Sequence, residues 1–167
     1  MNHLIDCSYY YTGPLQIQNA QAVDDLDNNA MAVQDAIKAY IARYQSDYLD
    51  KIVGEQVAEA ISEYLRRGEE DAGYCDERME VLCSRLRLPF AHYVYYKMVG
   101  DVNQTMTVTG LMKLKSANDN QPVRNRMVKV WNDMVDLHKK FLKLSDTSSF
   151  EVFYQSEMVT YINQFNL

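Results

Sequence analysis

Residues that break helices are scarce in this sequence. The 167 residues include only three Pro and six Gly. Sandwiches and barrels of many short strands need frequent tight turns, which Gly and Pro supply, so the composition disfavours both folds. No apolar run approaches the length of a membrane-spanning helix, about 18 residues. The first residues also lack the charged and then apolar plan of a secretory signal.

Cysteine and histidine are equally scarce, and their spacing does not suggest a metal site. An odd, small number of Cys is typical of reduced thiols in a cytosolic protein rather than of a disulfide framework. No two His lie four residues apart, and a lone His on an apolar helix is more often structural than a ligand. We therefore expect no metal and no cofactor. The residues concerned are Cys7, Cys75, Cys83, His3, His92 and His138.

The common motifs of catalytic sites are missing as well. The sequence contains no G-x-S-x-G, no Walker A motif and no G-x-G-x-x-G. Acidic clusters at 69–71 and 76–80 fall in stretches that we expect to be exposed, whereas paired catalytic carboxylates need burial to shift their pKa. We predict no catalytic residues and a protein that is not an enzyme.

Tyrosine, by contrast, is abundant, and charge is unevenly distributed. Thirteen Tyr suit half-buried positions and protein interfaces, because each side chain has an apolar ring and a polar hydroxyl. The net charge is −6, but residues 1–88 hold 16 acidic and 8 basic residues, whereas residues 113–143 hold 3 acidic and 8 basic. Two interpretations stay open: oppositely charged faces that meet other molecules, or ordinary solvated helix faces.

Apolar residues recur at helical spacing over most of the chain, which predicts an all-α fold. We expect a bundle of about five to six helices over residues 27–145, with residues 88–99 in its middle because they are apolar on nearly every side. The first helix is expected to end near Gln45-Ser46, and Gly54 to terminate a short helix after it. Pro89 is expected to break one helix and open the next.

The ends and one loop are predicted to lie outside this bundle. Residues 1–26 show no helical period and are expected to form an extended N-terminal arm, either poorly ordered or anchored by its tyrosines on a neighbouring subunit. Residues 146–167 are expected to form a C-terminal helix. Residues 101–121 alternate polar and apolar side chains around Gly110, the pattern of a β-hairpin-like loop that needs support from the bundle or another chain. The residues expected at a protein interface are Tyr9, Tyr10, Tyr11, Thr105, Thr107, Thr109, Met112, Lys113, Lys115, Arg124 and Arg126.

Five stretches follow one another in an informative order. They are Ala36-Ile37-Lys38-Ala39-Tyr40-Ile41, Tyr44-Gln45-Ser46-Asp47-Tyr48-Leu49 with Gly54, Phe90-Ala91-His92-Tyr93-Val94-Tyr95-Tyr96, Gln104-Thr105-Met106-Thr107-Val108-Thr109-Gly110, and Lys129-Val130-Trp131-Asn132-Asp133-Met134-Val135. A tyrosine-rich helix, a threonine-rich loop and a closing helix in this order resemble the head-to-tail connector, or adaptor, family of tailed bacteriophages. The resemblance covers roughly residues 30–143.

The resemblance implies a structural virion protein. Members of that family are small helical bundles that form rings, typically of twelve subunits, under the portal protein at the capsid vertex. They seat the stopper or tail protein and continue the channel through which genomic DNA passes without sequence-specific binding. By this resemblance we expect a homo-oligomer that is assembled in the host bacterial cytoplasm and has no membrane partner.

A small helical nucleic-acid-binding or packaging accessory protein is the alternative. Arg124, Arg126 and Lys129 lie near the start of a helix that Lys113 and Lys115 precede, and a basic helix can contact phosphates. The chain as a whole is acidic, however, and these charges are divided between a loop and a helix. An affinity for DNA that falls steeply with salt would favour this alternative.

Overall fold

The described part of the chain is built on four α-helices, which confirms the predicted all-α class. The computed structural model describes residues 3–21, 28–71, 73–102, 106–107, 110–111, 123–145, 154–163 and 165. The α-helices are α1 (Asn28–Val53), α2 (Glu55–Glu70), α3 (Glu77–Val102) and α4 (Val123–Ser145). The shorter elements are the 3-10 helices η1 (Cys7–Tyr10), η2 (Gly13–Leu15) and η3 (Ser156–Val159) and the strands β1 (Met106–Thr107) and β2 (Gly110–Leu111).

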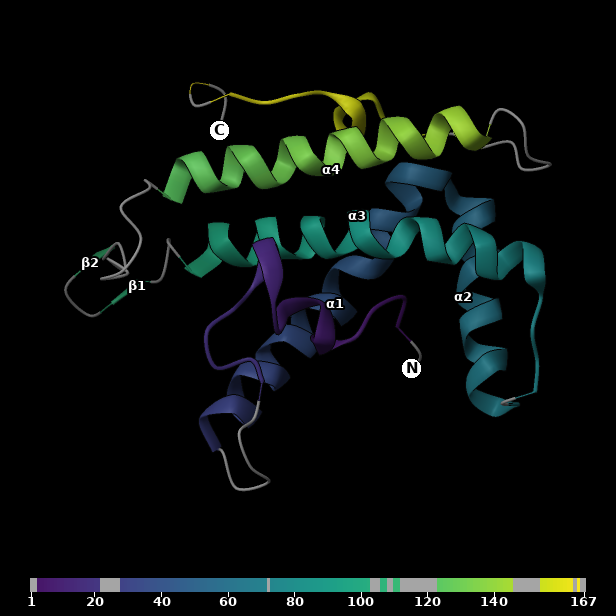
Figure 1. Cartoon of the computed structure of the whole chain (residues 1–167), viewed down its shortest axis with the longest axis horizontal. Helices are drawn as coiled ribbons and strands as arrows, with labels where there is room; N and C mark the ends of the chain where they lie inside the picture. The colour runs from purple at the N-terminus through teal and green to yellow at the C-terminus, as the bar shows by residue number, and fades with distance from the viewer. Residues whose placement is uncertain are drawn as a thin grey trace.

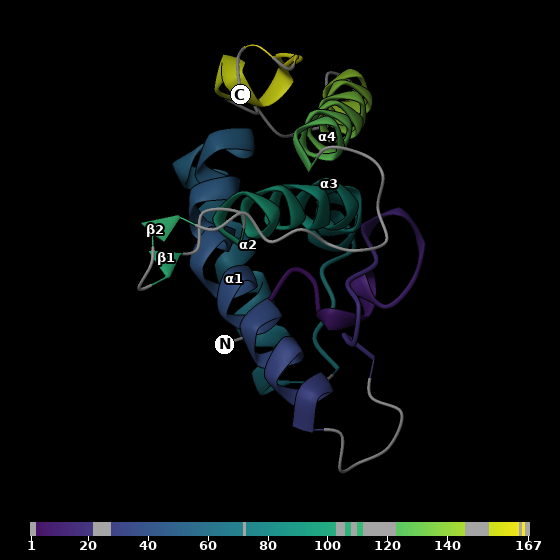
Figure 2. The ribbon, with the colours of Figure 1, turned by 90° about the vertical axis from the view of Figure 1, so that its left-hand side faces the viewer.

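Helix α3 lies at the centre of the arrangement, between α4 on one side and α1 on the other (Figures 1 and 2). Helix α4 runs antiparallel along α3, and α2 packs beside the first half of α3 (Figure 1). Every side chain at residues 89–95 is buried. The predicted position of this apolar stretch in the middle of the bundle is therefore confirmed.

The expected break at Pro89 is wrong, because Pro89 lies inside the continuous helix α3. Proline has no N–H, so the carbonyl of Arg85 loses its helical partner, and a proline inside a helix costs about 3 kcal/mol. Leu86, Phe90 and Val94 are each 0% exposed. Full burial of a large apolar side chain stabilises by roughly 1.5–3 kcal/mol, so the packing around Pro89 outweighs the lost hydrogen bond.

The predicted pair of helices before Gly54 is also wrong, since α1 continues through Ser46 to Val53. The buried side chains of Tyr48, Leu49 and Ile52 extend the apolar stripe past Ser46 and hold that segment in the helix. Gly54 ends α1 as predicted, with φ at 79°, a left-handed conformation that glycine adopts without strain. These merged segments explain why the described residues form fewer α-helices than the five to six expected.

The N-terminal segment is not an extended arm. Its described part, residues 3–21, forms η1 and η2 and folds back against α1 and α3 (Figure 2). Six of its apolar side chains are buried in the main hydrophobic core: Leu4, Ile5, Cys7, Tyr10, Leu15 and Ala20. The hydrophobic gain of burying these groups explains why the segment is folded although it has no helical period.

The described part of the C-terminal segment is not the continuous helix predicted over residues 146–167. Residues 154–163, here called the C-terminal strap, form η3 and then an irregular, extended segment that runs along α4 (Figure 1). Extended backbone cannot make helical hydrogen bonds, and side chains of α4 bind it instead. Residues 146–153 lie outside the described residues.

The β-hairpin-like loop predicted at 101–121 is not confirmed. Asp101 and Val102 belong to α3. Between α3 and α4 the structure describes only β1 and β2, an antiparallel pair in which Met106 faces Leu111 and Thr107 faces Gly110. The remainder of the loop lies outside the described residues.

Candidate interaction surfaces

The three consecutive tyrosines of the N-terminal segment have different environments. Tyr10 is 0% exposed, and its hydroxyl donates a hydrogen bond of 3.1 Å to the carbonyl of Ala91 in α3. Burial raises the pKa of Tyr10 well above its usual range. Tyr9 and Tyr11 are half-buried, and the Tyr11 hydroxyl accepts from Gln34 Nε2 at 3.3 Å. Tyr10 is therefore a core residue of the folded chain, which corrects its assignment to an interface.

The first turns of α4 form a basic end of the molecule. Arg124 is exposed. Arg126 is half-buried, with its guanidinium carbon 5.2 Å from the centre of the Tyr95 ring. Lys129 is exposed and pairs with Asp133 one turn later. Thr107 contributes its backbone to β1, and the other interface residues expected in the loop lie outside the described residues: Thr105, Thr109, Met112, Lys113 and Lys115.

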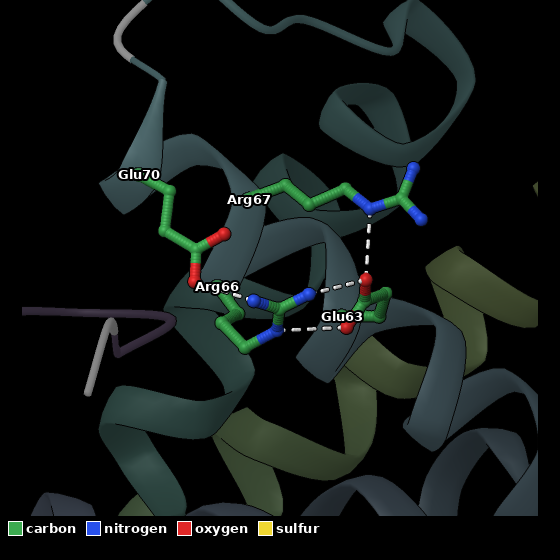
Figure 3. A network of polar contacts seen from close by, with 4 residues as sticks. All are labelled: Glu63, Arg66, Arg67 and Glu70. Carbon is green, nitrogen blue, oxygen red and sulfur yellow. Dashed lines mark hydrogen bonds and ion pairs between the residues drawn. The ribbon is translucent and has the colours of Figure 1, made fainter.

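Helix α2 and the start of α3 form an acidic end. Residues 55–80 hold nine acidic and three basic residues. The Glu63 carboxylate accepts hydrogen bonds from Arg66 Nη2 at 2.7 Å and from Arg67 Nε at 2.8 Å, and Arg66 also pairs with Glu70 (Figure 3). These hydrogen bonds lower the pKa of Glu63 to about 2. The exposed network neutralises both arginines locally and leaves this end with a net negative charge.

The two charged ends lie far apart on the molecule. Helix α4 begins at the end of the α3–α4 pair where β1 and β2 lie, whereas α2 packs at the opposite end (Figure 1). Glu59 and Glu63 line an open depression between α1 and α2. The folded chain therefore has a basic surface and an acidic surface at different ends.

The C-terminal strap lies on a third surface, which sequence analysis did not identify. This surface, here called the strap-binding surface, comprises the end of α1 and the face of α4 that contacts the strap. Its residues are Tyr48, Lys51, Trp131, Asn132 and His138. Polar residues inside an apolar helical stripe were the available signal, since His138 interrupts the stripe of α4. Such a signal marks a buried hydrogen bond but does not name its partner.

His138 joins three elements at the strap-binding surface. It is 0% exposed, with Nδ1 2.8 Å from the carbonyl of Met158 and Nε2 2.9 Å from the Tyr48 hydroxyl. A carbonyl can only accept, so Nδ1 carries the proton and the Tyr48 hydroxyl donates to Nε2. Burial lowers the pKa of His138 to about 4. The neutral ring is thus the form that fits this site.

The described residues hold no group of three or more His, Cys, Asp or Glu side chains placed to bind a metal ion. No helix within that part of the chain is both long and apolar enough to cross a membrane. No protein-family model, curated protein or solved structure matches this chain.

Proposed function

We propose that the protein is a structural subunit of a ring at the head-to-tail interface of a tailed bacteriophage. In this role it joins the portal protein to the stopper or tail protein and continues the DNA channel at the capsid vertex. The resemblance to connector proteins supports the proposal. The stretches that carry the resemblance lie on α1, on the buried half of α3, around β1 and on α4.

The observation that carries the proposal furthest is the separation of the basic and acidic ends. A closed ring needs a heterologous contact, in which one surface of a subunit binds a different surface of the next. The start of α4 and the face of α2 are oppositely charged and lie at opposite ends (Figure 1). When the basic end of each subunit binds the acidic end of the next, the same contact repeats around a closed ring.

The loop between α3 and α4 is the expected contact with a partner protein. A strand pair as short as β1 and β2 is marginal in water and gains stability when another chain adds a strand to it. Replacing Lys113 and Lys115 with Glu should weaken portal docking or ring formation. Unchanged assembly of this double variant with portal would show that the loop is not a contact with the partner protein.

The ring contact is tested by reversing one charge at each end. Arg124→Glu and Glu59→Lys should each reduce ring formation in the presence of recombinant portal, measured by light scattering and negative-stain microscopy. The combined variant should recover rings, because opposite charges meet again. Lys140→Glu, an exposed change near the other end of α4, is the matched control. Full assembly of both single variants would contradict the contact.

Affinity for DNA separates the proposal from the nucleic-acid-binding alternative. A connector lines a channel and should bind duplex DNA weakly at every salt concentration, which fits a net charge of −6. A binding protein that neutralises phosphates loses affinity steeply as salt rises. Fluorescence anisotropy with a labelled duplex in a salt titration distinguishes the two, and a steep loss would favour the alternative.

A further inference from the structure

The C-terminal strap is held chiefly by its main chain. The Gln155 N–H donates to the carbonyl of Lys51 at 2.8 Å, and His138 Nδ1 donates to the carbonyl of Met158. Trp131 Nε1 donates to the carbonyl of Thr160 at 2.9 Å. These contacts do not depend on which side chains the strap carries.

Asn132 makes the most specific of these contacts. Its Nδ2 donates to the carbonyl of Ile162 at 3.0 Å, and its Oδ1 accepts from the N–H of the same residue at 2.9 Å. One amide side chain thereby pairs with both main-chain groups of a single residue, as a neighbouring β-strand would. This arrangement recognises an extended peptide rather than a particular sequence.

Only one side chain of the strap supplies an apolar anchor. Met158 is 0% exposed, whereas every other residue of 154–163 is half-buried or exposed. Tyr161 lies on the surface, where Lys139 Nζ is 3.6 Å from its ring centre and its hydroxyl donates to Asp136. Such exposed contacts contribute little to affinity. The strap therefore binds as a ligand does, through main-chain hydrogen bonds and one anchor.

We propose that the strap-binding surface is a peptide-binding site and that the C-terminal strap is its exchangeable ligand. The ligand is an extended peptide with one methionine anchor, and the occupant that exchanges with the tethered strap is residues 154–163 of a second copy of this chain. The groups described above that bind the main chain of the strap belong to α1 and α4, so the helices retain them when the strap leaves. The inference does not depend on the proposed connector role.

The test uses the full chain and a labelled synthetic peptide of residues 154–163. Met158→Asp places a carboxylate in the buried anchor position and should release the strap from the strap-binding surface. The peptide should then bind this variant saturably in fluorescence anisotropy. Binding to the unchanged chain should be at least about tenfold weaker, since the tethered strap competes at a high effective concentration.

Two matched controls make the result specific. Asn132→Asp, added to the Met158→Asp chain, keeps the acceptor for the Ile162 N–H and loses the donor to its carbonyl. Peptide affinity should then fall at least about tenfold. A peptide that carries Asp in place of the methionine should not bind. No binding of the native peptide, or equal binding of both peptides, would overturn the inference.

A measurement on the unchanged chain covers the case in which Met158→Asp does not fold. An exchangeable ligand opens locally, so the amides of Gln155 and Ile162 should exchange hydrogen at least about tenfold faster than buried amides of α3. Exchange of both sets at the same rate, through global unfolding alone, would show that the strap is an inseparable part of the core.

Discussion

The two ends of the chain both cover helices, but they do so by different physical means. The N-terminal segment, residues 3–21, packs several apolar side chains into the main core. The C-terminal strap, residues 154–163, buries Met158 alone and relies on hydrogen bonds to its main chain. Apolar side chains make an end inseparable from the core, whereas main-chain hydrogen bonds and a single anchor leave it able to open on its own.

The largest expected effect concerns Tyr10 in the N-terminal segment. Tyr10→Ala should lower the free energy of unfolding by about 3–5 kcal/mol, because it removes a fully buried ring and leaves a cavity. The neighbouring change Tyr9→Ala, at a half-buried position, should cost less than half as much. Urea denaturation followed by far-UV circular dichroism measures both. Equally small losses would mean that the N-terminal segment, like the strap, is separable.

Acidification should weaken the contact between the strap and the core through His138. Its pKa is about 4 in the folded chain, and an unfolded histidine titrates near pH 6.5. Above about pH 6.5 neither state carries this proton, so the group has no effect on stability. Between about pH 6.5 and 4 the unfolded chain binds a proton that the folded chain does not, so stability falls by up to roughly 3 kcal/mol.

His138→Gln is the control for this pH dependence. The glutamine amide does not titrate and can still donate to the carbonyl of Met158. Burial also lowers the pKa of His92, but that contribution is present in both proteins and cancels in the comparison. Denaturation at several pH values should show a shallower loss for the variant. If the free energy of unfolding falls equally with pH in both proteins, protonation of His138 does not weaken the contact with the strap.

Asn132→Asp tests the strap without changing the core. We expect a loss of at least about 1.4 kcal/mol, the equivalent of the tenfold loss of peptide affinity, since the hydrogen bond from Asn132 to the carbonyl of Ile162 is removed. Exchange of the Ile162 amide should accelerate, while the amides of α3 keep their protection. Hydrogen exchange followed by mass spectrometry resolves the two regions. A uniform acceleration along the chain would indicate that the strap and the core unfold together.

The smallest expected effect concerns the ion pair between the strap and α1. Lys51 Nζ lies 3.3 Å from Glu157, whose side chain is 55% exposed. Glu157→Gln should change the free energy of unfolding by less than about 1 kcal/mol, because exposed pairs are screened by water and salt. Thermal denaturation at low and high salt measures this change. A larger loss would contradict the view that main-chain contacts hold the strap, because it would show that this ion pair contributes substantially.

Sequence periodicity located the helices well and their boundaries less well. The stripes that contain Ile37, Ile61 and Met134 predicted segments that are helical and buried. Ser46 and Pro89 predicted boundaries that do not exist, because local signals of about 1–3 kcal/mol were outweighed by burial of neighbouring side chains. Gly54 predicted its boundary correctly. Glycine adopts without strain the positive φ of 79° with which α1 ends there.

The candidate surfaces were predictable only in part. Net charge along the sequence indicated the basic and acidic regions, but not that the folded chain places them at opposite ends (Figure 1). The three tyrosines at 9–11 were treated as one group, and only the fold separates Tyr10 from its neighbours. The pairing of Asn132 with Ile162 had no signal, because main-chain groups are the same in every residue.

The sequence by itself determined the all-α class, the buried central position of residues 89–95 within the stretch 88–99, and the end of α1 at Gly54. Each of these follows from local periodicity or from the conformational freedom of one residue. Only the tertiary structure decided that the N-terminal segment enters the core, that α3 passes through Pro89 and that the C-terminal strap is held by its main chain. These outcomes depend on contacts between distant residues, whose energies exceed local preferences and leave no periodic pattern along the chain.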